Sequence, residues 1–327
     1  MFFRKSGGKP YRRVYGNDQK QKIKGQDMVV DQPGNVSARI RLLGRKDSCV
    51  YLLDGKDEYA LLGGGMVTIV PEVIQQLEAY RIDEKKIKRI VILHSHFDHC
   101  GIVPFFKRRW PWIRVMASQR AKELLADAKV NKTIESLNRM LITGEGLDAV
   151  AADLGYEFSG IMVDTVVKGN ELIPCGDLSM EVIEVPGHSS CSIAIYVQKE
   201  KALFASDAGG IPFGRRIFTA ANSNFDRYQE SLEKMSKFNT EIYLAEHFGA
   251  LIGEDCRGFF EKSMASAAQT RKLLEASLAH TGSVEKSTEE ITAKMTAGIT
   301  DGLLPKELIA MVIGQMLSYL YKQQRQN

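Results

Sequence analysis

The sequence predicts an α/β protein with a helical C-terminal part. Apolar runs rich in β-branched residues alternate with segments of helical periodicity along most of the chain, and this alternation is typical of α/β domains. Histidine or aspartate follows several of the strand-like runs, and α/β folds place their sites in the loops at strand ends. After Cys256 only helical patterns remain, which indicates a helical appendage.

The strands expected in the α/β part are bounded by glycine, proline and aspartate turn signals. They lie at 38–44, 48–55, 58–65, 87–96, 112–118, 178–189, 192–198, 202–210 and 241–248. Helical spacing of apolar residues predicts helices at 70–82, 118–142 and 226–238. In the last of these, one face carries Tyr228, Leu232, Met235 and Phe238. Three further helices are expected at 256–280, 285–299 and 304–325.

The composition indicates a globular protein with a sizeable core. The chain has 327 residues, 44% hydrophobic and 26% charged, with a formal net charge of +4. It contains no apolar run of the roughly 20 residues that span a bilayer, and its N-terminus lacks the apolar segment of a signal peptide. Five widely spaced cysteines without a CxxC pair indicate a reducing compartment. We therefore expect a cytoplasmic protein without a membrane partner.

The chain divides into three parts by composition. Residues 1–35 are polar and rich in lysine, arginine and glycine, and such basic arms are more often solvated termini than binding elements. We predict a weakly structured extension over 1–35, a catalytic domain over 36–255 and a helical cap over 256–327. The apolar residues of the cap have to be buried, either over a substrate pocket or in a homodimer.

The stretch HSHFDHC at 94–100 is the strongest functional signal. His94, His96, Asp98 and His99 supply imidazole and carboxylate groups, which suit borderline divalent ions such as zinc, iron or manganese. Four such side chains in six residues are too many for one tetrahedral centre, so the pattern favours two ions. Cys100 adjoins the cluster, and we interpret it as a packing residue.

Three more candidate ligands follow later strands. His188 comes after MEVIEVPG, Asp207 after ALFAS and His247 after EIYLAE. Five of the six histidines therefore lie just past apolar strands, and only His280 does not. The recurrence of this placement predicts one site at which several strand ends meet.

The motifs HxHxDH, Gly-His, Asp and a late His, taken in this order, resemble the metallo-β-lactamase-fold hydrolase superfamily over about 36–255. The resemblance implies a four-layer αββα sandwich with two divalent metal ions at one edge of the paired sheets. It also implies a metal-bound hydroxide as nucleophile and a catalytic role for Asp98 in orienting it. The ligand sets that it implies are His94, His96 and His188 for one ion, Asp98, His99 and His247 for the other, and Asp207 as the bridge.

Some segments are similar to a narrower group within this superfamily, the quinolone-signalling thioesterases with a helical C-terminal cap. These segments are HFDHCGIVPFFKRRWP, VMASQRA, ESLNRML and YQESLEKM. The similarity implies a small-molecule substrate with an acyl-CoA-like thioester. For the substrate side we expect contacts from Phe213, Arg215 and Arg216, which follow the bridging aspartate. The glycine-rich LGGGM at 62–66 lacks the lysine and serine of a phosphate loop and is expected to form a tight turn near the site.

Several other functions remain open from the sequence. They are hydrolysis of a glutathione thioester, a lactone or a phosphodiester, a mononuclear iron persulfide dioxygenase, and a regulatory role through protein contacts with residual hydrolysis. Gly210 stands where lactonases of this fold often have tyrosine, and the 40 residues from Asp207 to His247 leave no room for a long nuclease insert. These two observations disfavour a lactone and a nucleic-acid substrate.

Overall fold

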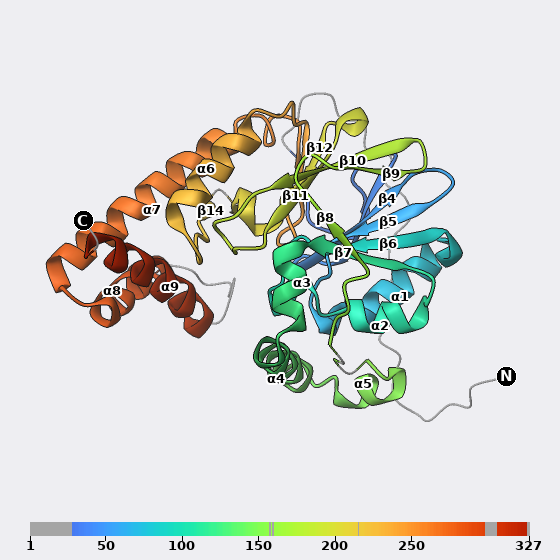
Figure 1. The fold of residues 1–327 in the computed structure, drawn as a ribbon, viewed down its shortest axis with the longest axis horizontal. Coiled ribbons are helices and arrows are strands. Elements are labelled where there is room, and N and C mark those ends of the chain that lie inside the picture. The colour runs from blue at the N-terminus through green and yellow to red at the C-terminus, as the bar shows by residue number, and fades with distance from the viewer. Residues whose placement is uncertain (1–27, 157, 159, 215, 298–305, 326–327) are drawn as a thin grey trace.

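The computed structural model describes residues 28–156, 158, 160–214, 216–297 and 306–325 (Figure 1). In this part of the chain two mixed sheets of seven strands each pack face to face, with helices on both outer sides. Three helices at the C-terminal end extend from one side of this body. The four-layer αββα sandwich with a helical appendage is therefore confirmed.

The first sheet contains, in spatial order, β2 (Gly34–Asn35), β3 (Ile40–Arg45), β4 (Ser48–Asp54), β5 (Tyr59–Leu62), β6 (Ile87–Val91), β7 (Arg114–Ser118) and β8 (Thr165–Val167). The second contains β1 (Met28–Val30), β16 (Ala250–Ile252), β15 (Ile242–Leu244), β12 (Ala202–Phe204), β11 (Ile193–Val197), β10 (Leu178–Glu184) and β9 (Leu172–Cys175). A separate hairpin consists of β13 (Ile211–Phe213) and β14 (Arg216–Phe218).

The helices of the sandwich are α1 (Val70–Ala79), α2 (Val103–Arg109), α3 (Gln119–Ala126), α4 (Ala128–Gly144), α5 (Asp148–Leu154) and α6 (Phe225–Ser236). The appendage consists of α7 (Phe259–Thr281), α8 (Val284–Thr296) and α9 (Lys306–Gln324). Within the described residues none of these helices has the length and apolar character needed to cross a membrane.

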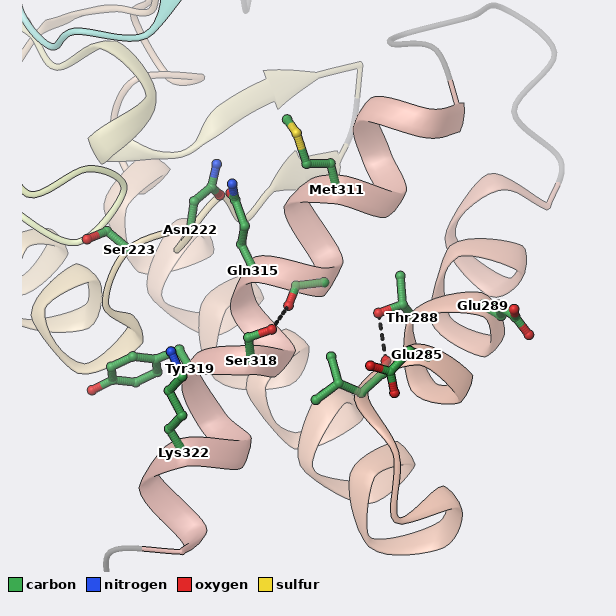
Figure 2. Close-up of a pocket in the computed structure, with 12 residues that line it drawn as sticks. Asn222, Ser223, Glu285, Thr288, Glu289, Met311, Gln315, Ser318, Tyr319 and Lys322 are labelled. Atoms are coloured by element: carbon green, nitrogen blue, oxygen red, sulfur yellow. Dashed lines mark hydrogen bonds between the residues drawn. The ribbon is translucent and has the colours of Figure 1, made fainter. Parts of the chain in front are cut away.

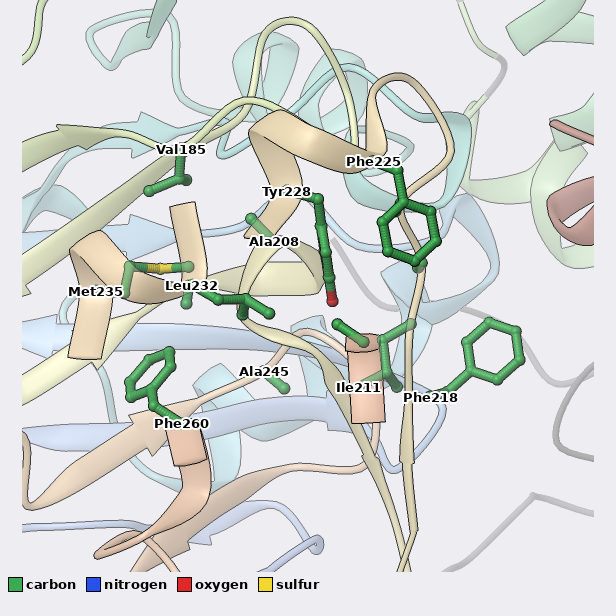
Figure 3. Packing of buried hydrophobic residues seen from close by; sticks show 14 of the residues in the cluster. Val185, Ala208, Ile211, Phe218, Phe225, Tyr228, Leu232, Met235, Ala245 and Phe260 are labelled. Carbon is green, nitrogen blue, oxygen red and sulfur yellow. The ribbon is translucent and has the colours of Figure 1, made fainter. Parts of the chain in front are cut away.

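The core consists of three apolar layers. One layer lies between the two sheets, the second joins α1 to α5 with the first sheet, and the third joins α6 and the C-terminal helices with the second sheet. Figure 3 shows part of the third layer, where Tyr228, Leu232 and Met235 project from one face of α6. All three are buried, as the spacing predicted, and Phe238 packs its ring on Tyr196 just beyond the helix. This layer fixes the appendage to the sandwich.

The appendage buries most of its apolar face within the chain itself. In α9 the residues Ile313, Met316, Leu317 and Leu320 are buried, Leu308 is half-buried and Met311 is exposed; Leu304 lies outside the described residues. Asp226 of α6 adds a polar clamp: it accepts hydrogen bonds from Tyr319 of α9 at 2.8 Å and from Arg271 of α7 at 2.5 Å. The C-terminal helices are therefore attached firmly to α6.

Three expectations differ from the structure. The expected helix over 118–142 is two helices, because Asp127 has an extended backbone and accepts from the amides of Lys129 and Val130 as the N-cap of α4. Strands begin at Met28, before the expected domain start at residue 36, because β1 pairs with β16. The pattern also missed several short elements, namely α2, α5, β2, β8, β9, β16 and the hairpin.

Candidate metal centre

The candidate ligands come together at one edge of the sandwich because their strands end there. His94 follows β6 in the first sheet, whereas His188, Asp207 and His247 follow β10, β12 and β15 in the second. A backbone hydrogen bond of 2.9 Å from Ile193 to Leu93 links the two sheets beside His94. The expected meeting of strand ends is thus present for all seven candidates.

The first group consists of His94, His96 and His188. Nε2 of His188 lies 3.1 Å from Nε2 of His94 and 3.0 Å from Nδ1 of His96. His94 and His188 are buried and His96 is half-buried. Around a four-coordinate zinc ion with bonds of about 2.0–2.1 Å, donor atoms lie roughly 3.3 Å apart, so the spacing of these nitrogens matches a metal site.

The second group consists of Asp98, His99 and His247. Nε2 of His247 lies 3.0 Å from Nε2 of His99, and Oδ2 of Asp98 lies 3.5 Å from both nitrogens. The His94 and His99 rings are 4.1 Å apart between centroids, so the two groups are adjacent. These atoms form a second set of one carboxylate and two imidazoles.

Backbone carbonyls determine which nitrogen carries the proton in two of the rings. Nδ1 of His188 lies 2.8 Å from the carbonyl oxygen of Ala220, and Nδ1 of His247 lies 2.7 Å from that of Asp47. A carbonyl oxygen only accepts, so each Nδ1 has to donate its hydrogen. In the neutral ring Nε2 then presents a lone pair to its group.

Side chains determine the same tautomer in two further rings. Oγ of Ser206 donates to the carboxylate of Glu246 and lies 3.2 Å from Nδ1 of His94, from which it accepts. Oε2 of Glu246 lies 3.0 Å from Nδ1 of His99, an ionic contact that is not aligned as a hydrogen bond but whose negative charge favours the hydrogen on that nitrogen. Neutral His94 and His99 therefore also direct Nε2 lone pairs into the two groups. In the first group, where the pKa of both rings is lowered, the lone pairs of His94 and His188 that face each other at 3.1 Å repel, and a cation bound between them removes this repulsion.

Asp207 lies between the two groups. Its Oδ2 is 3.1 Å from Nε2 of His99, 3.5 Å from Nε2 of His188 and 3.8 Å from Nε2 of His247. Its Oδ1 is buried and has no hydrogen-bond partner among the described residues. A buried carboxylate oxygen without a partner is costly, so this atom also fits a bound cation.

The two groups differ in their charge in the metal-free protein. Burial lowers the pKa of His94 and His188 and lowers that of His96 to about 3, so the first group is neutral. Burial also lowers the pKa of His99 and His247, but Asp207 and Asp98 outweigh it and raise both. The histidines hold the pKa of Asp98 and Asp207 below the usual range although burial opposes this. The carboxylates are thus ionised at neutral pH.

Comparison with known proteins agrees with this geometry. The family profile described as the metallo-beta-lactamase superfamily matches residues 43–247, which include all seven candidate ligands. The chain belongs to the metallo-beta-lactamase superfamily. The resemblance inferred from the motifs is therefore confirmed at this level.

Curated relatives in the superfamily match part of the chain. The metallo-beta-lactamase fold-containing protein ST1585 from Sulfurisphaera tokodaii is 26% identical over a stretch that covers 50% of this chain and 61% of the relative. The probable metallo-hydrolase YqgX of Bacillus subtilis is 30% identical over 40% of this chain and 56% of the relative. A hydroxyacylglutathione hydrolase of Prochlorococcus marinus is 29% identical over 56% of this chain and 61% of the relative. The chain thus matches only about three fifths of the length of these relatives.

Solved structures with the metallo-beta-lactamase fold match more of the chain. A family protein from Thermus thermophilus has a TM-score of 0.59 and 17% identity, with 90% of this chain and 94% of that chain covered. ST1585 from Sulfolobus tokodaii has a TM-score of 0.54 and 18% identity, with 91% and 97% covered. At this identity the similarity concerns the fold alone, and it extends to most of the chain.

The residues expected on the substrate side are placed unequally around the candidate metal centre. The ring of Phe213 packs edge-on against Phe248 at 5.2 Å, and Phe248 follows His247 directly. Arg216 is exposed on β14, and Arg215 lies outside the described residues. Cys100 is buried and its Sγ donates to the carbonyl of His96 at 3.1 Å, away from the two ligand groups.

A pocket of about 650 Å³ lies between the appendage and the loop before α6 (Figure 2). Its walls come from α8, α9 and the residues Asn222 and Ser223. This loop also contacts the candidate metal centre, since the carbonyl of Ala220 accepts from His188 and the amide of Ser223 donates to the carbonyl of Gly187 at 3.0 Å. The volume is within the usual range of small-molecule sites, roughly 300–1,000 Å³.

Sequence reasoning did not single out Ser206 and Glu246. Both are buried and each adjoins a candidate ligand, Asp207 and His247. A buried glutamate at a strand end beside a ligand is a usable signal in principle, because unpaired carboxylates are rarely buried. The spacing of ligands alone does not reveal which residues lie behind them.

Gly187 gives a test of how His188 is placed. Its φ is +135°, and an added Cβ would lie 2.2 Å from the backbone nitrogen of Tyr228 in α6. We expect Gly187→Ala to destabilise the protein by about 2–5 kcal/mol and to weaken metal binding by displacing His188. Urea unfolding and metal analysis measure the two effects. Gly155→Ala is the matched control, because φ is +65° there but the space is open; equal losses in both variants would contradict the clash.

Proposed function

We propose that this chain is a dinuclear metal-dependent hydrolase that cleaves thioesters of small acyl compounds. The observation that carries the proposal is the pair of ligand groups with converging lone pairs and Asp207 between them. His94, His96 and His188 would hold one divalent ion, and Asp98, His99 and His247 the other. Zinc and iron suit these donors best, and manganese is also compatible.

Divalent ions held there supply Lewis acidity, which polarises a carbonyl and lowers the pKa of water. Asp98 is the catalytic residue of the proposal. Its side chain is 18% exposed against 0% for His99, so it borders the space open to a substrate. Because its pKa is held low, Asp98 is an ionised acceptor that orients the attacking water through a hydrogen bond.

A thioester suits a site without a strong general acid. A thiolate leaves more readily than an alkoxide or an amine because a thiol has a pKa of roughly 8.5. The names of several relatives support this choice, since hydroxyacylglutathione hydrolases act on a glutathione compound by name. Acyl-CoA-like and glutathione-linked compounds both carry a long polar group beyond the thioester, and such a group requires additional room.

The pocket at the appendage provides such room. We propose a catalytic unit over about 36–255, extended by the strand that begins at Met28, and a cap over 256–327 whose α8 and α9 contact the remote part of the substrate. Phe213 and Arg216 are proposed substrate contacts at the other side, with Arg215 beside them in sequence. A cytoplasmic location and a homodimer through the C-terminal helices stay predictions; the five cysteines are buried free thiols, which suits a reducing compartment.

The function is tested with a substrate panel on one metal-analysed sample. We expect hydrolysis of acyl-CoA or glutathione thioesters with two metal ions per chain, and weak or no turnover of lactones and phosphodiesters. One iron per chain with oxygen uptake would favour a dioxygenase instead. Turnover of phosphodiesters above thioesters would also overturn the proposal.

Gly314 of α9 tests the use of the pocket. An added Cβ would lie 3.5 Å from Oγ1 of Thr288, an ordinary contact, so Gly314→Ala is expected to behave like the wild type. Gly314→Phe would fill the pocket, and we expect at least about a tenfold rise in KM, as loss of about 1.4 kcal/mol of binding gives. kcat and metal content should stay unchanged. An unaltered KM for every thioester in the panel would show that the substrate does not enter this pocket.

A further inference from the structure

Glu246 is a buried carboxylate behind the metal centre rather than in it. It is 2% exposed and precedes His247, but its side chain points to the Nδ1 side of His99, opposite to the Nε2 atom that faces the ligand group. Among the described residues this is the third carboxylate at the site, after Asp98 and Asp207. Burial of an ionised group at this depth is costly unless it has partners.

The glycine-rich turn at 62–66 forms the cavity that accepts Glu246. Gly63 has φ of +89°, and an added Cβ would lie 2.3 Å from Oε1 of Glu246. The amide of Gly64 donates to the same oxygen at 3.3 Å. The turn therefore has a specific purpose, since any side chain at Gly63 would displace the carboxylate.

Glu246 reaches both ligand groups. Oε2 contacts Nδ1 of His99 directly at 3.0 Å. The same oxygen accepts from Ser206, whose Oγ lies 3.2 Å from Nδ1 of His94. Ser206 has φ of +49°, a conformation that costs a non-glycine residue of order 1 kcal/mol. This strain is explained by the need to hold the hydroxyl between His94 and Glu246.

We propose that Glu246 and Ser206 form one positioning unit that couples the two metal positions. One carboxylate acts on His99 in the second group directly, through its charge 3.0 Å from Nδ1, and holds the tautomer and ring orientation of His94 in the first group through Ser206. The inference rests on the metal centre of the proposed function. It adds a shared support for both ions. Loss of Glu246 therefore weakens the binding of both ions, and loss of the Ser206 hydroxyl weakens the binding of one.

The atoms His94 Nδ1, His99 Nδ1 and Glu246 also lie close enough to be read as a third set of ligands. A neutral imidazole has one lone pair, and Nε2 of both rings faces the other two groups. Their Nδ1 atoms therefore carry hydrogens: that of His94 is donated to Ser206, and that of His99 faces the Glu246 carboxylate. Glu246 accepts from Ser206 and places its negative charge 3.0 Å from Nδ1 of His99, and outer carboxylates of this kind raise the basicity of histidine ligands.

The test measures zinc affinity by competition with a chromophoric chelator on metal-stripped protein. Loss of an outer hydrogen-bond partner typically costs 10–100-fold in metal affinity. We expect Glu246→Gln to weaken both zinc equivalents by about this factor. Ser206→Ala should weaken one equivalent and leave the other at wild-type affinity. Both variants should also shift the absorption bands of cobalt-substituted protein, which a purely structural role would leave in place.

The Ser277–Glu290 pair in the C-terminal helices provides matched controls. Ser277 of α7 donates to Glu290 of α8 at 2.8 Å, the same kind of contact without a histidine. Ser277→Ala and Glu290→Gln should therefore keep wild-type zinc affinity and cobalt spectra. Equal losses in the control variants would overturn the assignment to Glu246 and Ser206.

The outcomes separate the inference from the proposed function. If wild-type protein binds no zinc, the proposed metal centre fails. If wild type binds two equivalents and Glu246→Gln has the same affinities and cobalt spectrum, only the positioning unit is overturned. If Glu246→Gln does not fold, Ser206→Ala decides: weakening of one equivalent supports the coupling, and wild-type affinity for both refutes it.

Discussion

Replacing Asp207 with asparagine is expected to reduce hydrolysis by at least about 10³-fold and to release bound metal. Among the residues that the structure describes, Asp207 is the carboxylate that lies between both ligand groups. Asparagine keeps the shape but removes the negative charge, and a site for two dications then has Asp98 as its only anionic ligand. Since metal ions contribute several kcal/mol of transition-state stabilisation, losing them corresponds to this factor at about 1.4 kcal/mol per tenfold.

Metal content and activity have to be measured together in this variant. We expect fewer than two ions per chain by elemental analysis, and only partial recovery of activity with excess zinc. Asp164→Asn is a suitable control, because Asp164 is a surface carboxylate paired with Lys107 at 2.7 Å and surface pairs contribute little. Full metal content with full activity in Asp207→Asn would exclude Asp207 as a ligand between the two positions.

The convergence of the seven candidate ligands was readable from the sequence because it depends on local features. Each of His188, Asp207 and His247 follows a short apolar strand, and strand ends of α/β folds converge by topology. The dense spacing of the four candidates at 94–99 likewise indicated that their side chains lie together. The prediction therefore required only the strand pattern and the identity of the polar residues that follow it.

Contacts behind the ligands were not readable, because they join distant segments. Glu246 accepts a hydrogen bond from the amide of Gly64, which is 182 residues away. The carbonyl that accepts from Nδ1 of His247 belongs to Asp47, 200 residues away. No local periodicity encodes such pairs. The sequence showed a glycine-rich turn at 62–66, but only the fold shows that Gly63 makes room for a carboxylate.

Element boundaries failed where a local polar contact competed with the apolar pattern. The apolar spacing continues across Asp127, yet its carboxylate caps α4 and ends α3. Residues 28–30 look like part of a polar extension, but they pair with β16 across the chain. Capping and edge-strand pairing thus decided these boundaries against the periodic signal.

The metal-free protein is expected to lose stability steeply on acidification below about pH 6.5. Burial lowers the pKa of His94, His96 and His188, that of His96 to about 3. As the pH falls below the unfolded value of about 6.5, the unfolded chain takes up protons at these three positions while the folded chain does not. Each such group costs up to about 1.4 kcal/mol per pH unit, so the three reach a slope of about 4 kcal/mol per unit.

The other groups of the site do not cancel this slope. The pKa of His99 and His247 is raised. The stability that these two groups contribute is therefore fully present below about pH 6.5 and is lost as the pH rises through their pKa values in the folded protein. The pKa of Asp98 and Asp207 is lowered, and their contribution is lost only below about pH 4. Stability should therefore have its maximum near neutral pH and fall on both sides, more steeply towards acid.

Urea unfolding of metal-stripped protein at several pH values between 5 and 8 measures this dependence. His96→Gln removes one titrating group and should reduce the acid slope by about 1.4 kcal/mol per pH unit. His280→Gln is the control, because His280 is exposed at the end of α7 and lies outside the metal centre. Stability that stays level from pH 7 to 5 would mean that these three imidazoles are protonated in the folded protein, and the neutral first ligand group would then be wrong.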